Sequence, residues 1–346
     1  MKLQPCPTGV RILEGSYYEI GLQMGSALET LQIPEATDQR RVLAARCQAI
    51  VAETYPAILD KVEGMIEGGG LPSEDFKAYF YARELSSQMG CTNLAVLPGR
   101  TRGDSVLVGV NYDWYFQSQE WREIRSIRPE GALRSLRVTH HWAGSPDGIN
   151  EAGLGVFLSV LPQQEIAGPG LPWHLVTDIM LETCQNVTQA GAFLESVPRL
   201  RAFNYLVTDA LGQAAVLEAL PGSLNMREPE DGFLLATNHL PGREMPNGEL
   251  SEEDERRQRR SLARYERVRE ILEDSGAAID YAAMKTLLMD HQAPICRGNH
   301  EPIPGDDSYD NVFGTIWSLV ARPGRGDLQV AWGHPCRSEY VSYGPV

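Results

Sequence analysis

The chain has 346 residues, of which 42% are hydrophobic and 22% charged, so it can bury a core of the size found in ordinary globular proteins. Its 31 lysines and arginines stand against 46 aspartates and glutamates, which gives a formal net charge of -15. This excess of negative charge disfavours a nucleic-acid backbone or an anionic membrane surface as the main partner.

The N-terminal quarter of the chain is predicted to be mostly helical. A short strand, a glycine turn and the start of a helix are indicated over 10–25, with glycines placed for close backbone approach. Helical periodicity then runs from about 34 to 66 and ends at the GGGLP segment, 68–72. Ser73 is typical of an N-cap and predicts a further helix to about Gln88.

After residue 90 the pattern changes to short β-branched or alternating segments separated by glycine, proline and charged turns. This pattern predicts consecutive antiparallel strands, in the order CTNLAVL, SVLVGVNYDW, SLRVTHHW and GLGVFLSVL. Two helices are predicted at about 172–196, followed by strands in FNYLVTD, AAVLEAL and GFLLATN.

The C-terminal part combines a charged helix with two closing strands. Glutamate and arginine recur at helical spacing over 252–273, which predicts an exposed helix supported by ion pairs. TIWSLVARP and LQVAWG are the last predicted strands. Runs of strands alternating with pairs of helices favour an α+β architecture with helices in outer layers, built as one domain over 1–346.

Seven arginines lie between residues 100 and 137, directly after the first of these strands. Two interpretations remain open: solvated strand faces and loops, or a patch for an anionic acyl donor. The arginines are Arg100, Arg102, Arg122, Arg125, Arg128, Arg134 and Arg137.

The six cysteines are scattered, with no CxxC pair and no close cysteine–histidine spacing, so no disulfide framework, metal site or cofactor is predicted. The adjacent His140 and His141 would point to opposite faces of a strand and would not share a metal. The N-terminus lacks the apolar run of a signal peptide, and no later run is long enough to span a membrane, so we expect a cytoplasmic protein. The cysteines are Cys6, Cys47, Cys91, Cys184, Cys296 and Cys336.

Several segments resemble the penicillin acyltransferase family of self-processing acyltransferases and hydrolases. In chain order they are EGSYYEIGLQMG, YARELSS before MGCT, GVNYDW, GINEAGLGV, ATNH and SLARYERV. This family belongs to the N-terminal nucleophile (Ntn) hydrolases, together with the more distant choloylglycine hydrolases and acid ceramidases. The resemblance covers most of the chain and implies a four-layer αββα sandwich with two antiparallel sheets.

The resemblance also implies self-cleavage between Gly90 and Cys91, with Thr92 after the nucleophile. An α chain of residues 1–90 and a β chain of residues 91–346 would then remain associated. Glycine suits the cleaved bond because a residue without Cβ tolerates distorted backbone. The freed α-amine, with a pKa of roughly 7.7 to 8, can take the proton of a thiol that titrates near about 8.5, so no histidine is required.

By the same resemblance, Asp113 holds the new amine and Asn238 donates to the oxyanion. A donor of that kind is worth roughly a hundred- to a thousandfold in rate. Asn111 is a weaker candidate for supporting this site, and Trp114 and Tyr115 are candidates for lining the acyl pocket.

Each of these residues also has an ordinary structural interpretation. A buried cysteine such as Cys91 is usually a core residue, and Asp113 suits a turn or an ion pair with a nearby arginine. Asn238 suits a turn at the end of a strand, and the aromatic residues suit core packing.

The function implied is that of an amide hydrolase or N-acyltransferase, in which Cys91 forms a thioester with the acyl group of a small-molecule amide. Transfer from an acyl thioester donor in small-molecule biosynthesis is one alternative. An unprocessed member that only binds a ligand or partner is another, and a thiol hydrolase assisted by His239 or His140 is a third. The residues leave the acyl group, the acceptor and homo-oligomerisation open.

Overall fold

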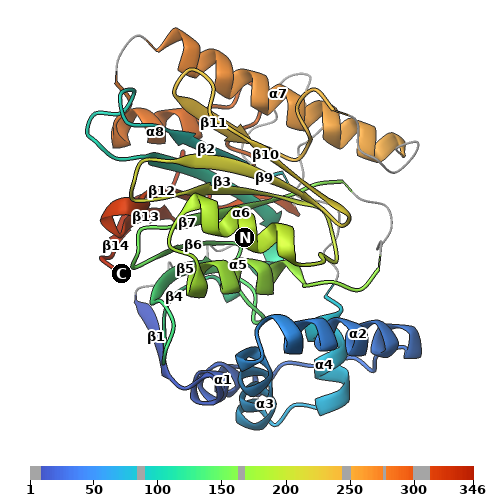
Figure 1. Cartoon of the computed structure of the whole chain (residues 1–346). Coiled ribbons are helices and arrows are strands. Elements are labelled where there is room, and N and C mark those ends of the chain that lie inside the picture. The colour runs from blue at the N-terminus through green and yellow to red at the C-terminus, as the bar shows by residue number, and fades with distance from the viewer. Residues whose placement is uncertain (1–8, 84–89, 163–167, 244–250, 276–277, 299–311) are drawn as a thin grey trace.

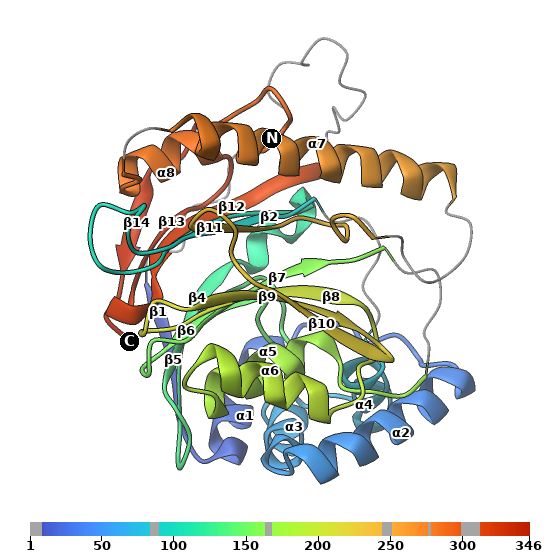
Figure 2. The same ribbon diagram turned by 45° about the horizontal axis from the view of Figure 1, so that its top comes forward.

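The computed structural model describes residues 9–83, 90–162, 168–243, 251–275, 278–298 and 312–346. Within these ranges two β-sheets lie face to face between two layers of helices (Figures 1 and 2). The predicted α+β fold with four αββα layers is confirmed. Among the described residues, no helix combines the length and hydrophobicity needed to cross a bilayer.

The larger sheet contains eight strands. Adjacent strands run antiparallel, except for the two strands at one edge, β1 and β4, which run parallel to each other. The predicted sheet was antiparallel throughout. In spatial order the strands are β1 (Val10–Gly15), β4 (Glu123–Pro129), β5 (Ser135–Thr139), β6 (Asp147–Asn150), β7 (Gly155–Val160), β8 (Phe203–Thr208), β9 (Ala214–Leu220) and β10 (Ser223–Arg227).

The smaller sheet contains six strands, all paired antiparallel. Strands β4, β6, β10 and β14 were not predicted. Of these, β10 and β14 are short and carry polar, largely exposed side chains without clear alternation. In spatial order the strands are β11 (Phe233–Ala236), β2 (Thr92–Val96), β3 (Leu107–Tyr115), β12 (Phe313–Arg322), β13 (Asp327–Ala331) and β14 (Tyr340–Tyr343).

The helices divide into a layer on each outer side of the sheets (Figure 2). On the side of the larger sheet lie α1 (Tyr17–Gly25), α2 (Asp38–Thr54), α3 (Ala57–Gly69), α4 (Ser73–Tyr81), α5 (Trp173–Thr183) and α6 (Val187–Ser196), of which α5 and α6 pack on its central and later strands. The smaller sheet is covered by α7 (Glu252–Asp274) and α8 (Tyr281–Leu288).

Two predicted helix boundaries are wrong. The helical segment expected over 34–66 is divided into α2 and α3, because Tyr55 leaves the helical conformation and Pro56 cannot continue the hydrogen bonding. Helix α4 takes Pro72 as its N-cap instead of Ser73, and it ends at Tyr81. The predicted end near Gln88 lies outside the described residues.

Helices α1 and α3 approach each other closely through glycines, as the glycine spacing predicted. A Cβ on Gly21 would lie 2.2 Å from the carbonyl oxygen of Lys61, and a Cβ on Gly64 would lie 2.2 Å from that of Tyr18. No side chain fits at either position, so the two helices pack backbone to backbone.

The helix α7 is exposed and rich in ion pairs over much of its length, as predicted. One face is nevertheless buried, through Ser261, Arg264, Val268 and Leu272. The spacing of these four residues is that of a helix face packed on a sheet, and it brings an arginine into the interior.

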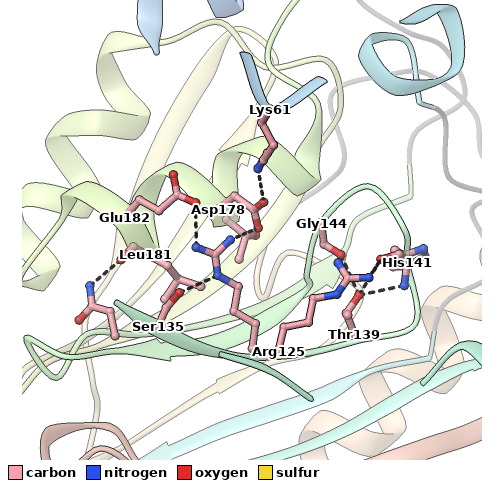
Figure 3. A network of polar contacts seen from close by, with 12 residues as sticks. Lys61, Arg125, Ser135, Thr139, His141, Gly144, Asp178, Leu181 and Glu182 are labelled. Carbon is pink, nitrogen blue, oxygen red and sulfur yellow. Dashed lines mark hydrogen bonds and ion pairs between the residues drawn. The ribbon is translucent and has the colours of Figure 1, made fainter. Parts of the chain in front are cut away.

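A buried ion network joins the N-terminal helices to the rest of the molecule (Figure 3). Lys61 of α3 lies 3.2 Å from Asp178 of α5, and Arg137 of β5 lies 2.7 Å from Asp178 and 2.8 Å from Glu182. The hydroxyl of Tyr17 donates to Glu182 at 2.8 Å. Burial acts to raise the pKa of Asp178, but Arg137 and Lys61 outweigh it and hold that pKa below its usual value.

We predict that Asp178→Ala lowers the free energy of unfolding by about 3–5 kcal/mol, because it leaves two buried cations without their shared carboxylate. Urea denaturation measures the change. Arg134→Ala is the matched control, since its 2.7 Å pair with Glu151 is solvent-exposed and should contribute less than about 1 kcal/mol. Equal losses in the two variants would contradict the prediction.

Candidate active site

Three neighbouring strands of the smaller sheet bring the predicted site residues together. Cys91 directly precedes β2, which pairs with β3 so that Thr92 lies opposite Asn111. On its other side β3 pairs with β12, and Asp113 lies opposite Thr315. Cys91 and Asp113 therefore meet on adjacent strands, as the spacing of the two strand patterns predicted.

The Cys91 thiol is fully buried and is held by a backbone hydrogen bond from Asp113. Burial raises the pKa of this thiol strongly, and the negative charges of Asp113 and Asp147 raise it further. The positive charge of Arg264 offsets only part of this effect. In this arrangement the sulfur is a protonated thiol at neutral pH, and it needs a base to become a nucleophile.

The Asp113 carboxyl group is buried and only half satisfied. Its Oδ1 accepts a 2.7 Å hydrogen bond from the Thr315 hydroxyl, whereas its Oδ2 is buried without a hydrogen-bond partner. Burial raises the pKa of Asp113 to about 7, although Arg297, Arg264 and the Thr315 hydrogen bond act to lower it. A buried carboxylate oxygen without a donor is rare in folded proteins.

The unpaired oxygen lies beside Gly90. A Cβ at this position would lie 2.7 Å from Oδ2 of Asp113 and 3.1 Å from Nη1 of Arg297. Glycine is therefore the residue that fits between the carboxylate and the guanidinium.

An arginine that was not singled out in the sequence links the remaining site residues. Arg264 of α7 donates through Nε to the Thr92 hydroxyl at 3.2 Å and through Nη2 to Oδ1 of Asn238 at 2.8 Å. The Asn238 amide nitrogen donates to the carbonyl of Val160 at 2.9 Å. Arg264 lies within the SLARYERV motif, at helical spacing from apolar Val268, and this spacing was the available signal that it faces inward.

Asn111 supports a neighbouring segment. Its side-chain amide donates to the carbonyls of Leu288 and Ile295, at 2.9 and 2.7 Å. These two bonds fix the chain that follows α8, and the role of Asn111 in supporting the catalytic site stays a prediction.

Residues 100–337 match the acyl-coenzyme A:6-aminopenicillanic acid acyl-transferase family. The chain belongs to this family. It is therefore an amide hydrolase or acyltransferase of the Ntn type. The matched range contains Asp113, Asn238 and Arg264, and it begins after Cys91.

The solved structures that resemble the chain at low sequence identity include the following three. Penicillin V acylase from Agrobacterium tumefaciens is 17% identical with a TM-score of 0.43, covering 70% of this chain and 83% of its own. A variant of conjugated bile acid hydrolase from Clostridium perfringens is 14% identical with a TM-score of 0.47, covering 73% and 96%. A Caenorhabditis elegans N-acylethanolamine-hydrolyzing acid amidase is 13% identical with a TM-score of 0.44, covering 68% and 93%. No curated protein matches the sequence.

Trp114 and Tyr115, the two residues predicted to line the acyl pocket, differ in their exposure to solvent. Trp114 is buried, and its ring lies 5.5 Å from that of His140 and 5.8 Å from that of His141. Tyr115 is partly exposed and packs edge-on against Phe313 at 5.4 Å. Only Tyr115 of the two presents surface to solvent here.

The prediction that His140 and His141 point to opposite faces is wrong. Strand β5 ends at Thr139, so the alternation stops before the pair, and the two rings lie 3.7 Å apart. Both contact the hydroxyl of Tyr112, at 3.2 and 3.3 Å. Burial and neighbouring positive charge hold the pKa of each histidine well below its usual value, so both are neutral.

His239 also occupies a structural position. Its Nδ1 lies 3.0 Å from the Thr237 hydroxyl and 2.9 Å from the Ser261 hydroxyl. Burial lowers the pKa of His239 to about 4, and Arg264 and Arg227 act in the same direction.

The arginines of the 100–137 segment do not form a free basic patch. Each has partners within the chain, and three of the seven are buried. The partners are backbone carbonyls for Arg100 and Arg122, Asp280 for Arg102, Glu123 for Arg125, Glu14 for Arg128, Glu151 for Arg134, and Asp178 with Glu182 for Arg137.

Asp147, a buried carboxyl group that was not singled out in the sequence, lies in the facing sheet. Asp147 of β6 accepts from the Trp317 indole at 3.1 Å, and Trp317 stacks on Tyr112 with ring centroids 4.1 Å apart. Burial raises the pKa of Asp147 to about 7, although its hydrogen bonds act to lower it.

We predict that Asp147→Asn flattens the pH dependence of stability. The folded protein keeps this proton up to a pKa of about 7, whereas the ordinary value is 3.8. The folded state therefore binds more protons between these values, and the free energy of unfolding falls as the pH rises through that window. The pKa of Asp113 is also raised to about 7, so this group too makes the free energy of unfolding fall as the pH rises.

Urea denaturation at several pH values between about 4 and 8 tests this linkage. Wild type should lose stability toward the upper end, and Asp147→Asn should lose less. Asp104→Asn, which changes an exposed carboxylate, is the control. The same slope in wild type and Asp147→Asn would refute the assignment.

Proposed function

We propose that the chain is a self-processing amide hydrolase in which Cys91, freed as an N-terminal residue, is the nucleophile. The observation that carries this proposal is the buried, unpaired Oδ2 of Asp113 beside Gly90. Breaking the bond after Gly90 creates an amine next to that oxygen. The amine would supply the hydrogen-bond donor that the carboxylate lacks.

Self-cleavage begins when the Cys91 sulfur attacks the carbonyl carbon of Gly90. The peptide C–N bond breaks, the nitrogen takes the thiol proton, and Gly90 is held as a thioester. Water then hydrolyses the thioester, which leaves a carboxylate on Gly90 and restores the thiol on Cys91. The close fit around Gly90 supports this step, because a Cβ there would collide with Asp113.

Substrate cleavage uses the new amine as the base. The α-amine accepts the thiol proton, and the ionised Asp113 stabilises the resulting ammonium. The sulfur attacks the acyl carbonyl carbon of the amide, and the ammonium then gives its proton to the leaving nitrogen. Water resolves the thioester and releases the carboxylic acid.

Asn238 is the proposed side-chain donor to the oxyanion, together with a backbone N–H. One of its two amide hydrogens is directed to Val160, and Arg264 fixes the other end of the side chain at 2.8 Å. Arg264 also bonds Thr92, next to the nucleophile. This bridge preorganises the donor relative to the sulfur, which is what oxyanion stabilisation requires.

The uncleaved arrangement fits a latent precursor. With no free amine, burial and two neighbouring carboxyl groups favour the neutral thiol of Cys91. Nor is a histidine base favoured, because burial lowers the pKa of His140 and His239 and makes both weak bases. Their ring nitrogens are also engaged, with Tyr112 for His140 and with Thr237 and Ser261 for His239.

Hydrolysis of a linear amide is the reaction that we favour over transfer from an acyl thioester. The arginine-rich segment was the feature that suggested an anionic carrier, and its arginines are engaged within the protein. Water is always available as the acyl acceptor, whereas transfer requires its exclusion.

The two fragments, 1–90 and 91–346, should stay together after cleavage. Lys61 of the first fragment contacts Asp178 of the second in the buried network of Figure 3. Tyr17, also of the first fragment, donates to Glu182 of the second. Separation would expose buried charges and the packed faces of the helices.

We predict that purified wild-type protein consists of two chains and that Cys91→Ala remains a single chain, because alanine has no sulfur to attack Gly90. A denaturing gel with intact mass analysis measures both. Cys184→Ala, which changes another buried cysteine, should still be processed. Cleavage in Cys91→Ala would exclude the self-processing role.

We predict that Asp113→Asn lowers kcat/KM at least about tenfold, equivalent to ~1.4 kcal/mol, because an amide cannot balance the ammonium charge. Asp147→Asn is the comparison variant, since it removes a buried carboxyl group of similar pKa that also acts on the Cys91 thiol but is not among the atoms nearest Gly90. An equal fall in kcat/KM in both variants would mean that loss of any buried carboxyl group lowers activity, and it would contradict a specific role for Asp113.

A panel of N-acyl amino acids, lactams and acyl thioesters, with and without amine acceptors, identifies the reaction. Release of free acid from linear amides supports the proposal. Preference for thioesters with an amine acceptor would establish acyl transfer. An unprocessed chain that binds without turnover would establish the binding role, and an active uncut chain inactivated by His239→Ala would establish the histidine-assisted route.

A further inference from the structure

A second cluster of reactive side chains lies outside the proposed catalytic residues. Donor atoms of His291, Cys296 and Cys336 all lie within 4.8 Å of one another. The two sulfurs are 3.6 Å apart. His291 and Cys296 follow α8, whereas Cys336 lies between β13 and β14.

We propose that these three residues bind a zinc ion. Two thiolates and one imidazole are a donor set that zinc prefers, with Zn–S distances of about 2.3 Å in a tetrahedral arrangement. Two sulfurs on one such ion are separated by about 3.8 Å, close to the 3.6 Å seen here. A disulfide requires a sulfur separation of about 2.05 Å, so the present geometry favours the metal.

The cluster also has the burial expected of a zinc site. Cys296 is buried, whereas His291 and Cys336 are partly exposed, which gives the ion a path from solvent. The chain around Cys296 is fixed by the backbone, since its N–H donates to the Asp290 carbonyl at 2.9 Å. The preceding Ile295 carbonyl accepts from Asn111 at 2.7 Å. Cys296 is therefore held in place before metal binds.

A short chain of contacts connects this site to Asp113. Cys296 is followed by Arg297, whose backbone N–H donates to the Thr315 hydroxyl at 3.0 Å and whose carbonyl accepts from the Thr315 N–H at 2.7 Å. The Thr315 hydroxyl in turn donates to Asp113. The Arg297 guanidinium lies against Gly90.

Zinc would thus act as a structural clamp. It joins the segment after α8 to the β13–β14 connection and fixes Arg297 beside Gly90 and Asp113. Loss of the ion should loosen this segment, so activity should fall together with stability. Zinc binding itself does not depend on the proposed role of Cys91.

The metal content of the purified full-length protein tests the proposal. We expect about one zinc per chain by elemental mass spectrometry, as for a site with three protein ligands. His291→Gln and Cys336→Ser should each lower the zinc content at least about tenfold after dialysis against a mild chelator, because each removes one of three ligands. Cys184→Ala removes a buried cysteine outside the cluster and should retain the metal.

Cobalt substitution provides a second readout. Reconstitution with Co²⁺ should give the intense near-ultraviolet absorption of thiolate ligation, and His291→Gln and Cys336→Ser should weaken it. A far-ultraviolet circular dichroism spectrum checks that each variant is folded.

Three results would overturn the proposal. The first is that wild-type protein contains no metal after it is equilibrated with zinc and desalted. The second is that His291→Gln and Cys336→Ser keep their zinc. A Cys296–Cys336 disulfide in the peptide map of the isolated protein would instead establish a redox pair. These outcomes are independent of whether Cys91 is processed.

Discussion

The candidate active site is organised around the buried carboxyl group of Asp113, which leaves no room for a side chain at Gly90. Asp113 sits in the interior of the smaller sheet with one oxygen bonded to Thr315 and the other unpaired beside Gly90. Burying a carboxylate is costly unless positive charge or donors compensate it. Arg264 and Arg297 supply the charge, and the amine proposed to form at Cys91 would supply the missing donor.

Buried arginines connect distant parts of this fold. Arg264 joins α7 to the start of β2 and to Asn238, on the side of the smaller sheet. Arg137 joins β5 to α5 on the opposite side, where Lys61 completes the network. In both places a planar guanidinium with several donors holds two segments at once. One bridge orients the proposed catalytic groups, and the other keeps the N-terminal helices attached.

The proposed zinc site extends this organisation to the edge of the smaller sheet. Arg297 follows Cys296 and pairs through its backbone with Thr315, so anything that fixes Cys296 also fixes a positive charge near Asp113. Asn111 holds the same segment, because its side-chain amide donates to the carbonyl of Ile295, the residue before Cys296. Support for the Asp113 carboxyl group is therefore spread over segments that are far apart in the chain.

Local patterns in the sequence determined most of the strands and helices, because alternation, helical spacing and turn residues act over a few neighbours. They also placed Cys91 and Asp113 on adjacent strands, since a turn separates two consecutive strand patterns. Tertiary structure alone decided which arginines are buried, that His140 and His141 share one face, and that Cys296 meets Cys336 across 40 positions. Such contacts depend on how whole layers pack, and no local spacing encodes that packing.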